Sequence, residues 1–146
     1  MDTYEALAER MLASMDKHRH MPPEPVSSTI RGEMAVLHLL SQEGRGLNAG
    51  EIAGMLRMTT SRIAAVLNSL EKKGMILRLC DPADKRRVLV TLTSRGMAYC
   101  LEKRREAKAH MTRLLSRLTE EEAETFTRLA IKLFDFAPEC RKDEEV

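Results

Sequence analysis

Apolar residues recur every three or four positions over most of the chain, which is the spacing of one buried helix face. Prolines and glycines interrupt this pattern at Pro22-Pro23-Glu24-Pro25, Gly44, Gly74 and Pro138. Each interruption favours the end of a helix. The pattern therefore predicts six helices: one over about residues 4–15, one that runs to Gly44, one over 48–57, one that ends before Gly74, a long one after Thr93, and a last one that ends before Pro138.

Helix-capping residues stand where several of these helices begin. Asn48-x-x-Glu51 and Thr119-x-x-Glu122 are capping boxes, in which the first side chain accepts a backbone N–H and the Glu reaches back. The other cap candidates are Ser27, Ser28 and Thr29 for the second helix, and Thr59 or Thr60 for the fourth. Two short helices are thus predicted to meet across a tight turn near Arg57.

The period changes to that of a strand over two short stretches. Residues Met75 to Cys80 and Val88 to Thr93 are rich in apolar and β-branched side chains, with polar residues interspersed. The segment between them, DPADKRR, is too long for a two-residue turn and too charged to be buried. The sequence predicts a hairpin with a basic tip that projects toward solvent or a partner.

The order helix, short helix, turn, helix, hairpin is typical of a winged helix-turn-helix, here carried by residues 47 to 93. The fold class is therefore expected to be mainly α, within α+β. The fourth helix would enter the major groove, its N-terminal end reading bases. An ordinary solvated helix face is the alternative. The candidate DNA-contacting residues here are Thr59, Thr60, Ser61, Arg62, Ala65, Asn68, Ser69 and Lys72.

Charge is distributed unevenly along the chain. The formal net charge is +2, yet the segment from Arg57 to Arg105 contains twelve Lys or Arg and four Asp or Glu, which gives it a net charge of +8. The remaining residues carry −6. The middle third is therefore the part suited to a polyanion.

Several motifs together resemble the MarR family of transcriptional regulators. The wing motif D-x-R leads into a strand as Asp84-Lys85-Arg86-Arg87-Val88-Leu89-Val90-Thr91-Leu92-Thr93. The other matching motifs are Glu51-Ile52-Ala53 with Leu56, Leu70-Glu71-Lys72-Lys73-Gly74, and Leu118-Thr119-Glu120. The resemblance spans about Ser28 to Phe134.

The resemblance implies roles for the tip of the hairpin. Arg86 would enter the minor groove, Asp84 would orient it, and Arg87 would help to bind phosphate, with Lys85 beside them. A narrow minor groove concentrates negative potential, which a guanidinium can enter. One departure is Ala64-Ala65, where family members often carry Thr-Arg; Arg62 is the candidate substitute.

Homodimerisation is expected because a palindromic site demands a two-fold partner. The whole chain, 1–146, is predicted to be one domain of the family type. Within it, 28–93 would be the DNA-binding lobe and 1–21 with 94–138 the helical dimerisation lobe. Interface candidates, each of which could equally belong to the chain's own core, are Tyr4, Leu7, Met11, Leu115, Leu118, Phe126, Leu129, Leu133 and Phe134.

Other chemistry is weakly represented. No catalytic motif is present, so neither an enzyme nor a cofactor is expected. The four histidines, His18, His20, His38 and His110, include no i, i+4 pair, which disfavours a metal site. No window approaches a membrane span, and three cysteines without a C-x-x-C pair fit a reducing cytoplasm.

The expected function is sequence-specific binding of double-stranded DNA, by a homodimer on a palindromic operator. A repressor is favoured because a bound dimer blocks polymerase; activation stays open. The resemblance adds possible release by a small anionic or aromatic compound. Some relatives respond to oxidation through a cysteine near the N-terminus, but Cys80, Cys100 and Cys140 lie elsewhere, which favours buried or incidental thiols. A winged protein-interaction adaptor that does not bind DNA is the alternative class.

Overall fold

The computed structural model describes residues 2–18 and 29–144. In it the chain divides into two compact units, one of Met1–Arg19 with Lys103–Val146 and one of His20–Glu102. The predicted break at residues 22–25 and the cap candidates Ser27 and Ser28 lie outside the described residues.

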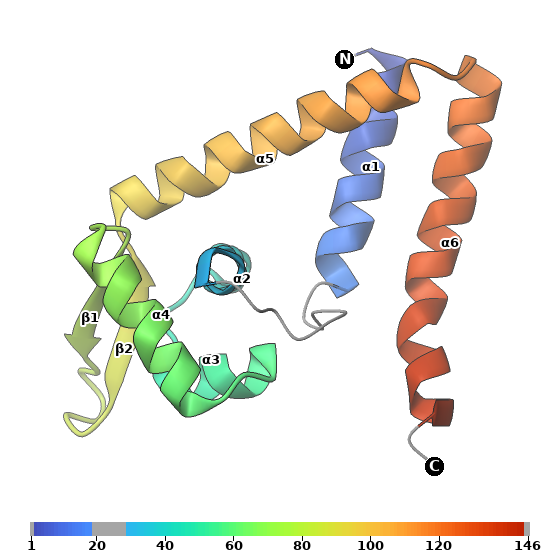
Figure 1. Cartoon of the computed structure of the whole chain (residues 1–146). Helices are drawn as coiled ribbons and strands as arrows, with labels where there is room; N and C mark the ends of the chain where they lie inside the picture. The colour runs from blue at the N-terminus through green and yellow to red at the C-terminus, as the bar shows by residue number, and fades with distance from the viewer. Residues whose placement is uncertain (1, 19–28, 145–146) are drawn as a thin grey trace. The chain divides into compact units, whose positions relative to one another are not determined.

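In its described residues, the second unit holds three complete helices, the first turns of a fourth, and a two-stranded antiparallel sheet (Figure 1). Helix α4 packs against the other two complete helices and against the first strand. The elements are α2 (Thr29–Glu43), α3 (Ala49–Leu56), α4 (Thr60–Lys72), β1 (Ile76–Cys80) and β2 (Val88–Leu92). The prediction of a mainly α fold with two short helices followed by a hairpin is confirmed.

Helix α5 (Ser94–Leu115) begins in this unit and ends in the other, where it is joined by α1 (Thr3–His18) and α6 (Glu120–Glu144). Helices α1 and α6 lie side by side and run in the same direction (Figure 1). Tyr4 Oη donates to the Leu118 carbonyl (2.8 Å), and Arg10 binds the Glu124 carboxylate (3.0 Å). In the same unit, Arg104 of α5 binds Glu9 (2.9 Å) and Asp16 of α1.

One helix boundary was predicted wrongly. Helix α6 was expected to end before Pro138, but helical backbone continues through this residue to Glu144. A proline removes one backbone donor and tends to kink a helix, and in this helix the following residues keep helical backbone.

The predicted caps form as expected. Asn48 Oδ1 accepts from Glu51 N (2.8 Å) at the start of α3, and Thr59 Oγ1 accepts from Arg62 N (3.2 Å) at the start of α4. Thr119 and Glu122 bind each other's backbone N–H reciprocally before α6. Each cap satisfies a donor that has no partner within the helix, typically worth about 1 kcal/mol.

The hairpin is anchored to the rest of its unit by a contact that the sequence pattern did not predict. Leu47, between α2 and α3, forms a bridge with Val90 through two backbone hydrogen bonds of 3.1 and 2.7 Å. Both side chains are buried. Beside this bridge, a Cβ on Gly46 would lie 3.1 Å from side-chain atoms of Leu89 and Thr91. The connection between α2 and α3 therefore lies directly on β2.

The two units have separate cores of different size. The core of the second unit consists of Val36, Leu37, Leu39, Leu40, Leu47, Ile52, Ala53, Leu56, Ile63, Val66, Leu67, Leu70, Ile76 and Val90. In the described part of the first unit, the core cluster consists of Leu7, Ala8, Met11, Leu115 and Ala123. Since each buried Leu or Ile contributes roughly 1.5–3 kcal/mol, the larger described core gives the α2–α4 unit more stabilisation from apolar burial.

Candidate nucleic-acid interface

Helix α4 turns one side into the core and leaves the other for a partner. Its buried side consists of Ile63, Val66, Leu67 and Leu70. The predicted contact residues that are exposed along the helix are Thr59, Thr60, Ser61, Ala65, Asn68 and Lys72, whereas Arg62 is half-buried. Ser61, Ala65, Asn68 and Lys72 recur every three or four residues and so share one face, which is narrow enough for a DNA groove.

Ser69, the remaining candidate on α4, points elsewhere. It is half-buried, and its hydroxyl donates to Glu33 Oε1 of α2 (2.5 Å). The other oxygen of Glu33 accepts from Lys73 Nζ (2.7 Å). Ser69 and Lys73 together hold the C-terminal half of α4 against α2 through one carboxylate.

The Glu33 side chain is only 10% exposed, so its charge depends on these partners. Burial alone would raise the pKa of this carboxyl, but the hydrogen bonds from Lys73 and Ser69 outweigh burial and hold the pKa below its ordinary value of 4.5. The depressed pKa means that the ionised form stabilises the folded chain.

We expect Glu33→Gln to lower the free energy of unfolding by about 1–2 kcal/mol at neutral pH, because a charge-assisted bond to Lys73 is lost. The contribution of Glu33 is present above pH 4.5 and is lost as the pH falls through its lowered pKa. Urea unfolding of both proteins at about pH 7 and about pH 3 measures the difference. If the difference in free energy of unfolding between the two proteins stays constant, or grows in acid, this role of Glu33 is contradicted. Glu43→Gln, on the same helix, is the matched control. The ion pair of Glu43 with Arg45 is long (3.8 Å), so its loss should change the free energy of unfolding little.

The loop between β1 and β2, residues 81–87, is held by its own hydrogen bonds. Asp81 N donates to the Arg87 carbonyl and Arg87 N to the Asp84 carbonyl, both at 2.9 Å. The side chains of Asp81 and Asp84 each accept from the backbone N–H two residues on, at Ala83 and Arg86. These local bonds pre-form the tip of the hairpin, so less entropy is lost when it binds.

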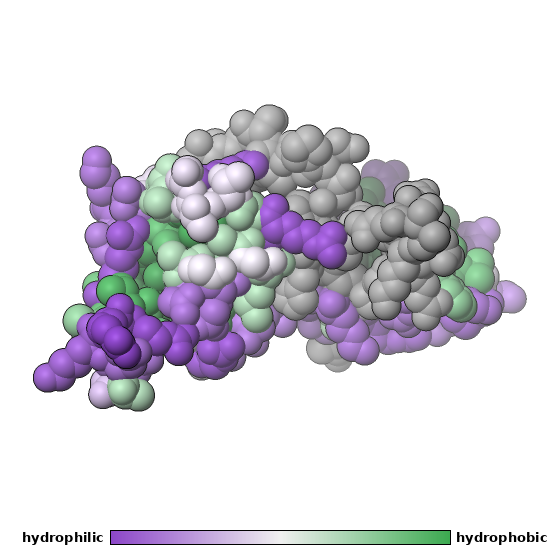
Figure 2. All heavy atoms as spheres, turned by 90° about the horizontal axis from the view of Figure 1, so that it is seen from below, coloured by the Kyte–Doolittle hydropathy of each residue, from purple (hydrophilic) through white to green (hydrophobic). Residues whose placement is uncertain are grey.

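The tip places two of its basic side chains in solvent. Arg86 has a 93% exposed side chain, and its Nε lies 3.3 Å from Asp84 Oδ1. Lys85 beside it is exposed. An exposed pair of this kind is worth under about 1 kcal/mol, so Asp84 orients Arg86 without holding it back from a partner. Figure 2 shows hydrophilic side chains gathered at the tip of the hairpin, at the lower left of the view.

Arg87, predicted to bind phosphate, forms an ion pair with Glu51 of α3. Its guanidinium donates to Glu51 Oε1 (2.6 Å), and the same carboxylate accepts from Asn48 Nδ2 (2.7 Å). Arg45 lies 3.4 Å from its other oxygen. Glu51 therefore joins the start of α3 to the base of the loop, in addition to its place in the capping box.

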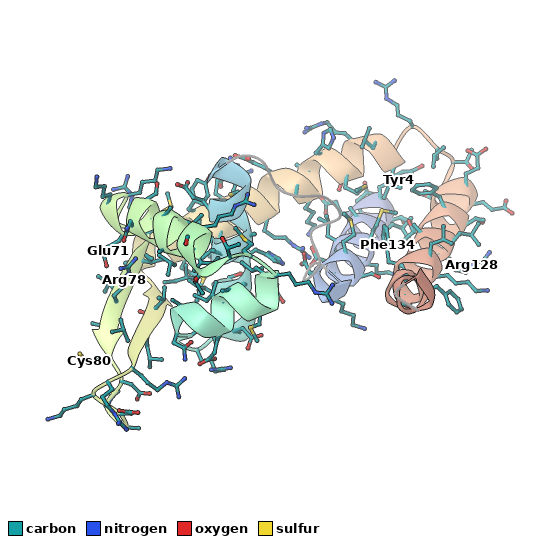
Figure 3. All side chains as sticks on the ribbon, turned by 60° about the horizontal axis from the view of Figure 1, so that its bottom comes forward. Tyr4, Glu71, Arg78, Cys80, Arg128 and Phe134 are labelled. Atoms are coloured by element: carbon teal, nitrogen blue, oxygen red, sulfur yellow. The ribbon has the colours of Figure 1, made fainter. Side chains whose placement is uncertain are left out.

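Arg78 was missed as a candidate. It lies in β1 opposite Val90 and extends from the hairpin to α4. There it donates to Asn68 Oδ1 (2.9 Å) and approaches Glu71 Oε2 (3.8 Å); Figure 3 shows Arg78 and Glu71 close together. The sequence offered one signal, a charged residue within an otherwise apolar strand.

The cysteine and histidine side chains that the structure describes form no cluster; those of His18, His20 and Cys140 lie outside the description. Cys80 is exposed at the end of β1, while Cys100 donates to the Leu37 carbonyl (3.7 Å) and burial raises the pKa of its thiol. Across the residues that the structure describes, no three His, Cys, Asp or Glu side chains are placed to hold a metal ion. Nor do the described helices include one long and apolar enough to span a bilayer.

Comparison with known proteins identifies the class to which this fold and surface belong. Residues 31–88 match the sequence profile of the MarR family. The transcriptional repressor Rv2887 of Mycobacterium tuberculosis is 37% identical over 103 residues, which cover 69% of this chain and 72% of that protein. The chain therefore belongs to the MarR family, and it is a DNA-binding transcriptional regulator rather than an enzyme.

Solved structures agree with this assignment. The YusO protein from Bacillus subtilis superposes with a TM-score of 0.66 at 30% sequence identity, over 92% of this chain and 88% of that one. Streptococcus pneumoniae FabT, solved in complex with DNA, has the same fold, with a TM-score of 0.62 at 22% identity over 76% of each chain. The predicted winged helix-turn-helix fold is thereby confirmed.

Proposed function

We propose that this regulator is a repressor that binds a palindromic operator as a homodimer. In this proposal α4 enters the major groove and Arg86 enters the adjacent minor groove. The observation that carries it is the pairing of a narrow polar face on α4 with a pre-formed hairpin tip whose arginine is 93% exposed. Because its target is chromosomal DNA, we keep the cytoplasm as the proposed location.

The proposed dimer rests on an apolar stripe along α6. Phe126, Leu129, Leu133 and Phe136 are between 47% and 69% exposed, and their spacing puts them on one side of the helix. We call these four residues the α6 stripe. Of the other interface candidates, Leu7, Met11 and Leu115 belong to the chain's own core, and Tyr4, Leu118 and Phe134 pack against it. Exposed apolar side chains on one side of a helix favour an interaction surface, and in this proposal the partner is a second copy of the chain.

Selection of bound DNA from a random pool tests this proposal directly. A repressor dimer is expected to enrich a palindrome, and binding is expected to fall steeply between roughly 50 and 200 mM salt as condensed counterions are released. Failure to enrich any sequence would favour the adaptor alternative. Release by a small anionic or aromatic compound stays a prediction, which titration of such compounds against the operator complex would test.

Arg86 and Arg62 of the proposed interface are expected to contribute differently to operator affinity. Arg86→Ala should weaken operator binding by about 10- to 100-fold, because a minor-groove guanidinium makes close contact with a region of high negative potential. Arg62→Ala should cost less, because Arg62 is half-buried and Ala64 and Ala65 leave the reading surface of α4 with little charge. Titrations on the selected operator compare the two variants; a larger loss for Arg62→Ala would reverse this order.

A further inference from the structure

Arg78 lies in β1 and contacts one of the exposed side chains of α4. It pairs across the hairpin with Val90, which is 1% exposed, so both side chains lie on the face of the sheet that is turned toward the core. From there the Arg78 side chain, which is 32% exposed, reaches α4. It donates to Asn68 Oδ1 at 2.9 Å and lies 3.8 Å from Glu71, the residue three positions further along α4.

The chemistry of this contact fixes the orientation of the Asn68 amide. A guanidinium carries five N–H donors and no acceptor, so the Asn68 oxygen must face Arg78. The Asn68 amide nitrogen, with its two donors, then faces away from the hairpin. Glu71 contacts the same guanidinium and holds it in place, which also lowers the net charge that Arg78 can offer to a phosphate.

Asn68 lies on the exposed face of α4, in line with Ser61, Ala65 and Lys72. An asparagine reads adenine by donating to N7 and accepting from the N6 amino group, which needs both its oxygen and its nitrogen toward the base. With the oxygen turned to Arg78, the amide group presents its N–H donors on the side that faces away from the hairpin. Such a group suits the N7 and O6 acceptors of guanine.

We propose that Arg78 is a specificity-determining residue: by holding Asn68 in its donor orientation, it makes the protein read guanine rather than adenine at one position of each half-site. This inference rests on the proposed function, in which α4 lies in the major groove. Arg78 itself acts through Asn68 as a positioning residue.

The test is random-pool selection followed by titration of operator variants with each base at each position. Wild type is expected to prefer guanine at one position per half-site by about tenfold, the size of a good base contact. Asn68→Ala should abolish that preference. Arg78→Met keeps the aliphatic stem but removes the donors, so it should let adenine bind about as well as guanine there, and the double variant should match Asn68→Ala.

Lys72→Met is the matched control, because Lys72 is exposed on the same face. It should weaken all sequences alike and reduce the salt slope by about one, leaving base preferences unchanged. If Arg78→Met behaves in the same uniform way, the inference is overturned and Arg78 is a phosphate contact. Should Arg78→Met fail to fold, Glu71→Gln is the second variant, since it loosens the anchor of Arg78 and should reduce the guanine preference part of the way; an unchanged preference overturns the inference.

The two proposals fail in different ways. If wild type enriches no sequence, the proposed function is overturned, and the inference with it. If wild type enriches a palindrome but Asn68→Ala keeps every base preference, the proposed function stands and the inference is overturned.

Discussion

Leu133→Asp is expected to leave the chain monomeric and to weaken operator binding by at least about 100-fold. In the proposed dimer the α6 stripe is buried between the two chains. A carboxylate buried there without a partner costs several kcal/mol. A cost of about 3 kcal/mol already corresponds to a 100-fold loss of affinity. A monomer also loses the gain in affinity from engaging two linked half-sites. Because Leu133 is 69% exposed within one chain, its replacement should not disturb folding.

Sedimentation at micromolar concentration measures the first effect, and titration of the selected operator measures the second. Arg128→Asp is the matched control: it introduces the same side chain at an exposed position on α6 whose helical spacing puts it outside the α6 stripe. It should remain dimeric. A Leu133→Asp protein that sediments as a dimer and binds DNA normally would remove the α6 stripe from the interface.

Gly96→Ala is expected to lower the free energy of unfolding by about 2–4 kcal/mol, although alanine is the better helix former by about 1 kcal/mol. Gly96 lies in the first turn of α5, and a Cβ there would stand 2.1 Å from the Met75 carbonyl oxygen and 3.2 Å from Leu92 Cδ2. The Met75 oxygen also accepts from Thr93 N (3.1 Å), so it cannot move away without opening the base of the hairpin. Helix α5 would have to shift off the sheet.

The control for this substitution is Gly54→Ala in α3. A Cβ on Gly54 meets nothing within 4 Å, so there the gain in helix propensity should appear alone, as a stabilisation of about 0.5–1 kcal/mol. Urea or thermal unfolding of the two variants should therefore shift in opposite directions. Equal or greater stability of Gly96→Ala would show that the start of α5 has room to relax.

The parts of the fold that the sequence predicted depend on residues close together in the chain. The capping pairs Asn48 with Glu51 and Thr119 with Glu122 are three residues apart, and each formed as expected. Periodicity likewise separated buried from exposed positions on α4. Pro138 was misread because a proline lowers helix propensity locally, while the continuation of α6 depends on the residues around it.

The candidate site was predicted less completely, because its geometry depends on contacts between distant residues. Ser69 shares the polar character of its neighbours, and only the fold shows that Glu33, 36 positions away, takes its hydroxyl. The contact between Arg78 and Asn68 depends on how the hairpin lies against α4. Helical periodicity assigns a residue to a face but says nothing of which strand borders that face.

The ion pairs around the hairpin bear on how such a protein would search a genome. Arg45 and Arg87 share Glu51, and Arg78 lies near Glu71, so three cations that composition alone would assign to DNA already have carboxylate partners. When the protein binds DNA of arbitrary sequence, fewer counterions are then released, so it binds such DNA weakly and dissociates from it quickly. Since non-specific sites outnumber an operator by roughly a millionfold or more, weak general adhesion keeps more of the protein available for its own sequence.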